Sequence, residues 1–256
     1  PSDRNIFSRI FEMHQRNGAA NKKILTYLAD TFRYPTCFET LLYASQLLQA
    51  EAIRYGVEHF RRNRGRCMGT LYWQINDVWP VASWSSIDYY GRLKALHYVA
   101  KRFYAPVLLS CAETGETDSR PIVTMERKRY DYETKATLAV TNDTETVFKG
   151  SIHWELRRSD TSIIESGVAA VCVDPFSVLK LEEIDFHKTD VHNNYMSYSL
   201  EINGRTISSG SVLFTAPKHF DFIDPKLEYK IDGDKITVYS AAYAKSVEIY
   251  STESDF

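Results

Sequence analysis

The chain has 256 residues, of which 44% are hydrophobic and 25% charged, a composition typical of a globular protein. Its formal net charge of −2 gives no electrostatic reason to expect nucleic acid or an anionic membrane as a partner. No apolar run approaches the ~18 residues of a membrane span. The four scattered cysteines form no Cys-x-x-Cys pair, which favours reduced thiols and a cytoplasmic location.

The N-terminal part combines helical and strand patterns. Thr36 and Glu39 have the spacing of a capping box, which predicts a helix over residues 36–63. The short apolar run over residues 67–73 is typical of a strand buried on both faces. Helical spacing returns over residues 91–104. A strand that ends in aromatic and amide side chains and precedes a helix is typical of a barrel with a binding site at its strand ends.

Alternation of apolar and polar residues dominates from about residue 107 to 216. The run over residues 196–202, for example, alternates apolar residues with serines, and the Asn203-Gly204 pair that follows predicts a hairpin. About seven short strands of this kind predict an immunoglobulin-like sandwich. The disulfide of antibody domains is not expected, because Trp154 and Cys172 have no well-placed partner.

The last part of the chain predicts the beginning of another β domain. Residues 217–225 have the composition of a linker, and strands are expected over residues 227–231, 236–238 and 247–249. Three strands alone make a marginal unit. The chain also opens without Met and ends directly after a strand pattern. We therefore expect it to be an excerpt of a longer protein.

Hydrolysis of a glycosidic bond requires two carboxyl groups that face each other across that bond. Glu39 is explained by the capping box, and Glu51 and Glu58 lie inside a helix, where a solvated or salt-bridged role is usual. Glu12 and Asp77 lie in loops without an evident opposing partner. We predict no catalytic pair in this chain. No phosphate loop, nucleophile elbow or metal motif is present either, so neither a cofactor nor a metal is expected.

Trp73 is the strongest candidate for contact with a ligand. It ends the predicted strand beside Gln74 and Asn76, where a ring offers a flat apolar face and the amides fix the orientation of a ligand. Burial for packing alone is the alternative for this tryptophan. The His14-Gln15-Arg16 cluster suits binding of a polyol or a carboxylate, or is a solvated loop in which Arg16 binds a carbonyl group.

A resemblance to a known family lies in residues 69–92, which begin Gly-Thr-Leu-Tyr-Trp-Gln-Ile-Asn-Asp-Val-Trp-Pro and continue through an aromatic loop. This stretch resembles the β-mannosidases of glycoside hydrolase family 2. The similarity extends to residues 14–16 and 46–58 upstream and to residues 94–106 downstream. Residues 213–220 resemble the family's junction between its two C-terminal β domains.

The resemblance implies a (β/α)8 TIM barrel that hydrolyses terminal, non-reducing β-D-mannose residues with retention and without a cofactor. On this basis residues 1–105 are the C-terminal part of the catalytic barrel. Residues 106–217 are an immunoglobulin-like β-sandwich, and residues 218–256 are the first strands of a further β-sandwich domain.

The family uses two glutamates, one in a Ser-Glu-Phe/Tyr-Gly stretch and one in an Asn-Glu pair. Neither stretch is present here, so we expect no catalytic residue in this chain and no activity from the chain alone. The resemblance carries over Trp73 as the tryptophan of the eighth barrel strand, which lines the sugar pocket, with Asn76 and Asp77 at the rim. A β-mannoside is the implied partner, with no role for nucleic acid or membrane.

Two alternatives remain open. The first is a carbohydrate-binding or spacer module without catalysis, and the second is a β-galactosidase or β-glucuronidase of the same family. A partial barrel would also leave apolar faces uncovered on the helix over residues 36–63 and the strand over residues 67–73. We therefore expect either that the chain is part of a longer protein, whose other residues cover these faces, or that it associates with itself.

Overall fold

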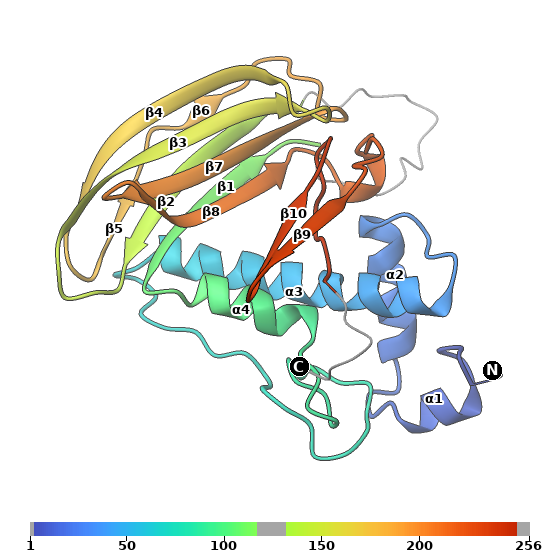
Figure 1. Ribbon diagram of the computed structural model, residues 1–256. Coiled ribbons are helices and arrows are strands. Elements are labelled where there is room, and N and C mark those ends of the chain that lie inside the picture. Colours follow the sequence, from blue (N-terminus) through green and yellow to red (C-terminus); the bar gives the residue numbers. More distant parts are fainter. Residues whose placement is uncertain (1–2, 117–131, 250–256) are drawn as a thin grey trace. The chain divides into compact units, whose positions relative to one another are not determined.

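The computed structural model describes residues 3–116 and 132–249. The chain divides between Leu108 and Leu109 into two compact units. Figure 1 shows helices in the first unit and β-sheets in the second. Among the described residues, no helix combines the length and the apolar character that a membrane crossing requires.

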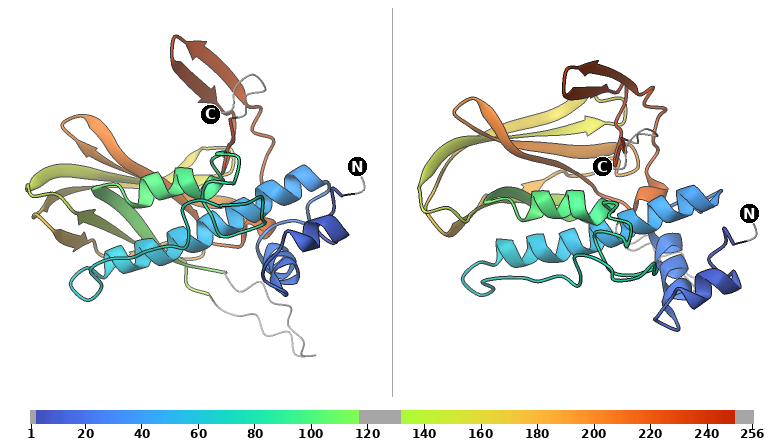
Figure 2. Two further views of the ribbon diagram at one scale, coloured as in Figure 1. Left: turned by 90° about the horizontal axis from the view of Figure 1, so that it is seen from below. Right: turned by 60° about the horizontal axis from the view of Figure 1, so that its bottom comes forward.

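The described residues of the first unit contain four α-helices: α1 (Arg9–Met13), α2 (Ala20–Thr31), α3 (Phe38–Arg62) and α4 (Ala95–Phe103). The two helices expected from periodicity correspond to α3 and α4, which pack side by side (Figure 2). Ala50 and Val57 of α3 and Leu96, Ala100 and Phe103 of α4 form their shared core. The apolar spacing of each helix therefore marks the face that it buries against the other.

The capping box of α3 differs from the expected one. Cys37, not Thr36, is the N-cap residue, and its backbone N–H donates to Thr40 Oγ1 at 3.2 Å. Glu39 forms an ion pair with Arg4 instead. The hydroxyl of a threonine at the third helical position can accept a hydrogen bond from this N–H, as a carboxylate would. The capping box is therefore formed one residue later than expected, and the helix is still formed.

The strand expected over residues 67–73 is not formed. These residues lie in an irregular segment, in which Leu71 is fully exposed. A buried parallel strand needs hydrogen-bonded neighbours on both sides. The described residues before Val107 contain no strand that could supply them, only isolated bridges such as that between Asn76 and Ile87. The expectation of a buried strand was wrong, and a TIM barrel is not established by this fold.

The second unit contains two four-stranded sheets. The first sheet has the order β1-β2-β5, with β6 also paired to β2, and the second has the order β4-β3-β7-β8. The bounds of the strands are β1 Val107–Thr114, β2 Lys135–Asn142, β3 Phe148–Arg158, β4 Ile163–Val173, β5 Ser177–Lys180, β6 Ile184–Asp185, β7 Asn194–Ile202 and β8 Arg205–Leu213. This is the predicted immunoglobulin-like sandwich (Figure 1).

Alternation along the strands predicts the core of the sandwich correctly. Leu138 on β2 and Met196 and Leu200 on β7 are fully buried. The predicted hairpin joins β7 to β8 through Asn203 and Gly204, with φ of 51° and 72°. Positive φ at both central positions is the requirement of a type I′ turn, which Asn and Gly meet at least steric cost.

The remaining described elements follow the sandwich. They are the 3-10 helix η1 (Pro217–His219) and the strands β9 (Glu228–Asp232) and β10 (Lys235–Tyr239), which pair with each other. Residues 247–249, expected to form a third strand, are irregular. Tyr243 stacks on Tyr195 of β7, with ring centroids 3.8 Å apart. The expected domain boundary between residues 217 and 218 stays a prediction.

Candidate sugar-binding site

The candidate site lies in the segment between α3 and α4, residues 63–94, here called the connecting loop. Side chains alternate along its extended part. Leu71, Trp73 and Ile75 are exposed, and Tyr72 is half-buried against the core of α3 and α4. Trp73 is 73% exposed, so packing in the core does not explain this tryptophan. The peptide bond between Trp73 and Gln74 is cis.

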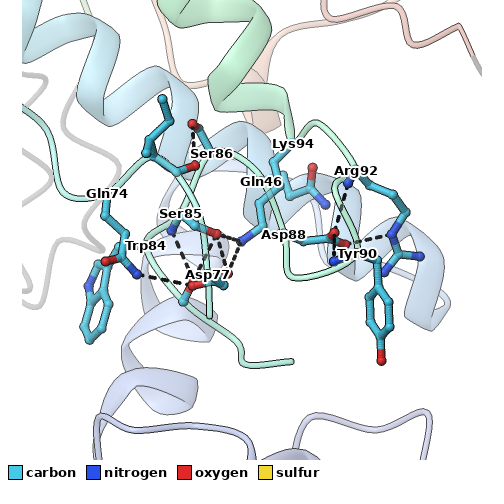
Figure 3. Close-up of polar contacts among 12 residues, drawn as sticks. Gln46, Gln74, Asp77, Trp84, Ser85, Ser86, Asp88, Tyr90, Arg92 and Lys94 are labelled. Atoms are coloured by element: carbon cyan, nitrogen blue, oxygen red, sulfur yellow. Dashed lines mark hydrogen bonds and ion pairs between the residues drawn. The ribbon is translucent and has the colours of Figure 1, made fainter. Parts of the chain in front are cut away.

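Asp77 lies at the centre of a buried polar network (Figure 3). Its carboxylate accepts hydrogen bonds from Gln74 Nε2 at 3.2 Å and from Ser85 Oγ at 2.5 Å. Ser83 Oγ lies 2.6 and 2.8 Å from the two carboxylate oxygens. The oxygens of Asp77, which was expected at a pocket rim, are therefore engaged by side chains of the loop itself.

Lys94 completes this network from the residue before α4. Its Nζ donates to Ser85 Oγ at 2.7 Å and lies 3.8 Å from Asp77 Oδ2. Burial lowers the pKa of Lys94 below its ordinary value, because desolvation disfavours the ammonium ion, while Asp77 and Asp88 act in the opposite direction. Lys94, Ser83 and Ser85 were missed from the sequence, since no spacing rule connects them to Asp77.

Asn76 and the pair formed by Tyr90 and Arg92 are exposed side chains of the connecting loop. The Asn76 side chain is exposed, and its backbone forms a bridge with Ile87. Further along, Asp88 Oδ1 accepts the N–H groups of Tyr90 and Arg92, and the Arg92 guanidinium lies 5.1 Å from the Tyr90 ring centroid (Figure 3). Trp73, Asn76 and this pair therefore offer aromatic and amide groups to the solvent.

The His14-Gln15-Arg16 cluster packs on the connecting loop. The His14 ring stacks on Trp79 with centroids 5.4 Å apart, and its Nδ1 contacts the carbonyl oxygen of Pro80. Arg16 lies 4.5 Å from the Trp79 ring centroid. The Ala82 N–H also donates to the His14 carbonyl at 3.0 Å. These contacts give His14 and Arg16 a structural role, in which Arg16 binds an aromatic face and not the carbonyl considered from the sequence.

Carboxylates inside α3 form ion pairs with arginine. Arg54 contacts Glu51 at 2.8 Å and Glu58 at 2.9 Å. This agrees with the salt-bridged role predicted for both glutamates. Among the described residues, no group of three or more His, Cys, Asp or Glu side chains has the arrangement of a metal site.

The sandwich is similar to a known family of domains. Residues 134–219 match the model of the Mannosidase Ig/CBM-like domain. β-Mannosidase B from Aspergillus niger is 27% identical over 237 residues, which cover 87% of this chain and 27% of that protein. The β-mannosidase of Capra hircus is 38% identical over 112 residues, which cover 39% of this chain and 12% of that protein. The chain thus spans a minor part of the relatives that it matches.

Solved structures share the fold. A β-D-mannosidase from Dictyoglomus thermophilum superposes with a TM-score of 0.81 at 23% identity, over 94% of this chain and 28% of that one. An exo-chitosanase from Amycolatopsis orientalis gives a TM-score of 0.54 at 16% identity, over 73% of this chain and 21% of that one. Residues 134–219 thus match a Mannosidase Ig/CBM-like domain, and most of the chain is similar in sequence and in fold to parts of known β-mannosidases.

Proposed function

We propose that this chain is part of an exo-acting β-mannosidase, which hydrolyses terminal, non-reducing β-D-mannose residues with retention. The exposed ring of Trp73 is the observation on which this proposal rests. Its ring is exposed on an extended segment, and a large apolar ring exposed beside amide groups is characteristic of a sugar-binding surface. The β-mannosidases related to this chain support the choice of mannose over galactose or glucuronic acid.

Within that enzyme, residues 1–105 would be the last part of the (β/α)8 barrel. The alternation of exposed and half-buried side chains over residues 71–75 supports this, because a barrel strand has one face toward the helices and one toward the interior. Residues 106–217 would be the immunoglobulin-like sandwich, and residues 218–256 the first strands of a further domain.

Direct contact with the sugar is proposed for the indole of Trp73 and the amide of Asn76, both of which are exposed. Asp77 belongs to the same wall of the site, and its buried carboxylate would act by fixing the connecting loop. Retaining hydrolysis needs two carboxyl groups about 5–5.5 Å apart. Because Asp77 is already engaged by loop side chains and Glu51 and Glu58 by Arg54, we propose that this chain recognises sugar without cleaving it.

Hydrolysis assays test this assignment. The purified 256-residue chain is expected not to turn over 4-nitrophenyl β-D-mannoside. The enzyme that contains these residues is expected to cleave this substrate in preference to the corresponding β-galactoside and β-glucuronide. Appreciable turnover by the chain alone would show that the catalytic carboxylates lie within it. A preference for galactoside or glucuronide would overturn the choice of mannose.

Calorimetric titration of the chain with a manno-oligosaccharide separates the enzyme from the alternative of a binding module. Binding that is lost in Trp73→Ala places the sugar on the connecting loop, as proposed. Binding that survives this change would place the sugar elsewhere, and would favour a carbohydrate-binding role for the sandwich.

A further inference from the structure

The connecting loop has no regular secondary structure that could fix the ring of Trp73. The backbone holds the next residue, Gln74, through two hydrogen bonds: its N–H donates to the Trp84 carbonyl at 3.4 Å, and its carbonyl accepts the Ser86 N–H at 3.0 Å. The first of these is long for an amide hydrogen bond. Side chains must therefore supply much of the order in this part of the loop.

Asp77 connects the two sides of the loop near Trp73. Gln74, on one side, and Ser83 and Ser85, on the other, all have side chains within hydrogen-bond distance of its carboxylate. Hydrogen bonds to a charged acceptor are stronger than those between neutral groups. The buried carboxylate therefore holds Gln74 in place, and with it the adjoining Trp73.

Lys94 connects this network to α4. Its side chain is 14% exposed, although lysine is rarely buried unless it is paired. The neighbouring α4 is itself fixed, because Leu96 is fully buried in the core shared with α3 and Gln46 Oε1 accepts the Ala95 N–H at 3.1 Å. Lys94 is the N-cap residue of this helix, so its ammonium group reaches into the loop from a backbone position that α4 fixes.

We infer that Lys94 and Asp77 are positioning residues, which together fix the ring of Trp73 for contact with the sugar. The inference rests on the proposed function, and it adds residues that do not touch the substrate. Lys94 acts through Ser85 and Asp77, and Asp77 acts through Gln74 (Figure 3). Gln74 follows Trp73 directly in the chain. A change at Lys94 should therefore reach the indole without altering any group that contacts sugar.

Fluorine NMR of the full chain labelled with 5-fluorotryptophan tests this directly. The chain has four tryptophans, and each resonance can be assigned with its Trp→Phe variant. In Lys94→Met, which keeps the length of the side chain and removes its charge, we expect the Trp73 resonance to shift and broaden. Trp154, which lies in the second unit, should be unaffected.

Two matched variants control for charge. Lys94→Arg keeps the cation and should restore the Trp73 resonance. Lys101→Met removes the same charge from an exposed position of α4 and should leave the Trp73 resonance unchanged.

A further variant covers the case in which Lys94→Met fails to fold. Ser85→Ala removes the hydroxyl group between Lys94 and Asp77 without leaving a lone ion, and it should still shift the Trp73 resonance. An unchanged Trp73 resonance in folded Lys94→Met or in Ser85→Ala would overturn the inference.

Titration of the same samples with methyl β-D-mannoside separates the inference from the proposed function. In the wild type, the Trp73 resonance should shift when the mannoside binds. Lys94→Met should bind the mannoside about tenfold more weakly than the wild type. A different result is that the Trp73 resonance of the wild type stays unchanged on addition of the mannoside while Lys94→Met still shifts it. That result would contradict the sugar contact and support the positioning role. Equal affinities in wild type and Lys94→Met would contradict the positioning role alone.

Discussion

An exposed indole and a buried carboxylate lie four residues apart in this chain and have opposite surroundings. Trp73 projects from the extended part of the connecting loop, whereas the Asp77 side chain is 1% exposed. The exposed indole can contact a ligand directly. The buried group can only act on other residues of the protein.

Trp73→Ala is expected to weaken binding of a β-mannoside by about 2 kcal/mol, the size of effect seen when a dominant aromatic contact is truncated. The free energy of unfolding should change by no more than about 0.5 kcal/mol, because the ring is largely outside the core. Calorimetric titration and chemical denaturation measure the two quantities. Phe176→Ala, at an exposed aromatic of the second unit, is the control and should leave binding unchanged. A large loss of stability in Trp73→Ala would instead indicate a packing role.

At the level of elements, α3 contains an acidic residue whose charge is unfavourable in the folded state. Glu58 is buried, and burial raises its pKa above the ordinary value of 4.5, although Arg54 and Arg62 act in the opposite direction. A raised pKa in the folded state means that folding favours the protonated acid. The contribution of Glu58 to stability is therefore complete below pH 4.5 and decreases as the pH rises through its folded pKa.

The Glu58→Gln variant tests the direction of this pH dependence. Its free energy of unfolding, relative to wild type, should increase between pH 4.5 and 7, at about 1.36 kcal/mol for each unit by which the pKa is raised. Urea denaturation at a series of pH values measures the difference. A difference that decreases with pH would mean that the arginines dominate over burial.

In the sandwich, Gly167 of β4 lies opposite Trp154 of β3. A Cβ atom at this glycine would lie 2.4 Å from the indole, closer than real contacts allow. The rigid ring, which packs against Phe186 with centroids 5.7 Å apart, would have to move. The close approach of strand and ring therefore requires glycine at this position.

Gly167→Ala is expected to destabilise the second unit by about 1–3 kcal/mol, the usual cost of overpacking. Thermal and urea denaturation measure the effect. Val168→Ala, at the next, exposed position of the same strand, should cost much less. Comparable losses in the two variants would argue against the steric explanation.

At the scale of the whole molecule, the exposed apolar side chains of the connecting loop predict self-association of the chain. Leu71, Ile75 and Val78 are all more than half exposed. Apolar side chains along an extended segment are a surface on which another chain can pack. Multi-angle light scattering should therefore give a mass that rises with concentration. Leu71→Lys should shift the distribution toward the monomer, whereas Leu227→Lys, outside the loop, should not. A monomer at all concentrations would contradict the prediction.

Sequence patterns alone determined the elements that local periodicity defines. The helical spacing of α3 and α4, the alternation in β2 and β7 and the Asn203-Gly204 turn all correspond to observed structure. Each depends on interactions between residues a few positions apart, or on which face of an element is apolar. The salt-bridged role of Glu51 and Glu58 followed from helix geometry in the same way.

Only the tertiary structure decided whether the connecting loop contains a strand and which of its side chains are buried. An apolar run over residues 67–73 predicts a buried strand, but a strand forms only where neighbours supply hydrogen bonds, and sequence spacing does not show whether they are present. Likewise, Asp77 appears in the sequence as one more loop carboxylate. Its burial beside Ser83, Ser85 and Lys94 arises because an irregular chain brings these side chains together, and no periodic pattern encodes that arrangement.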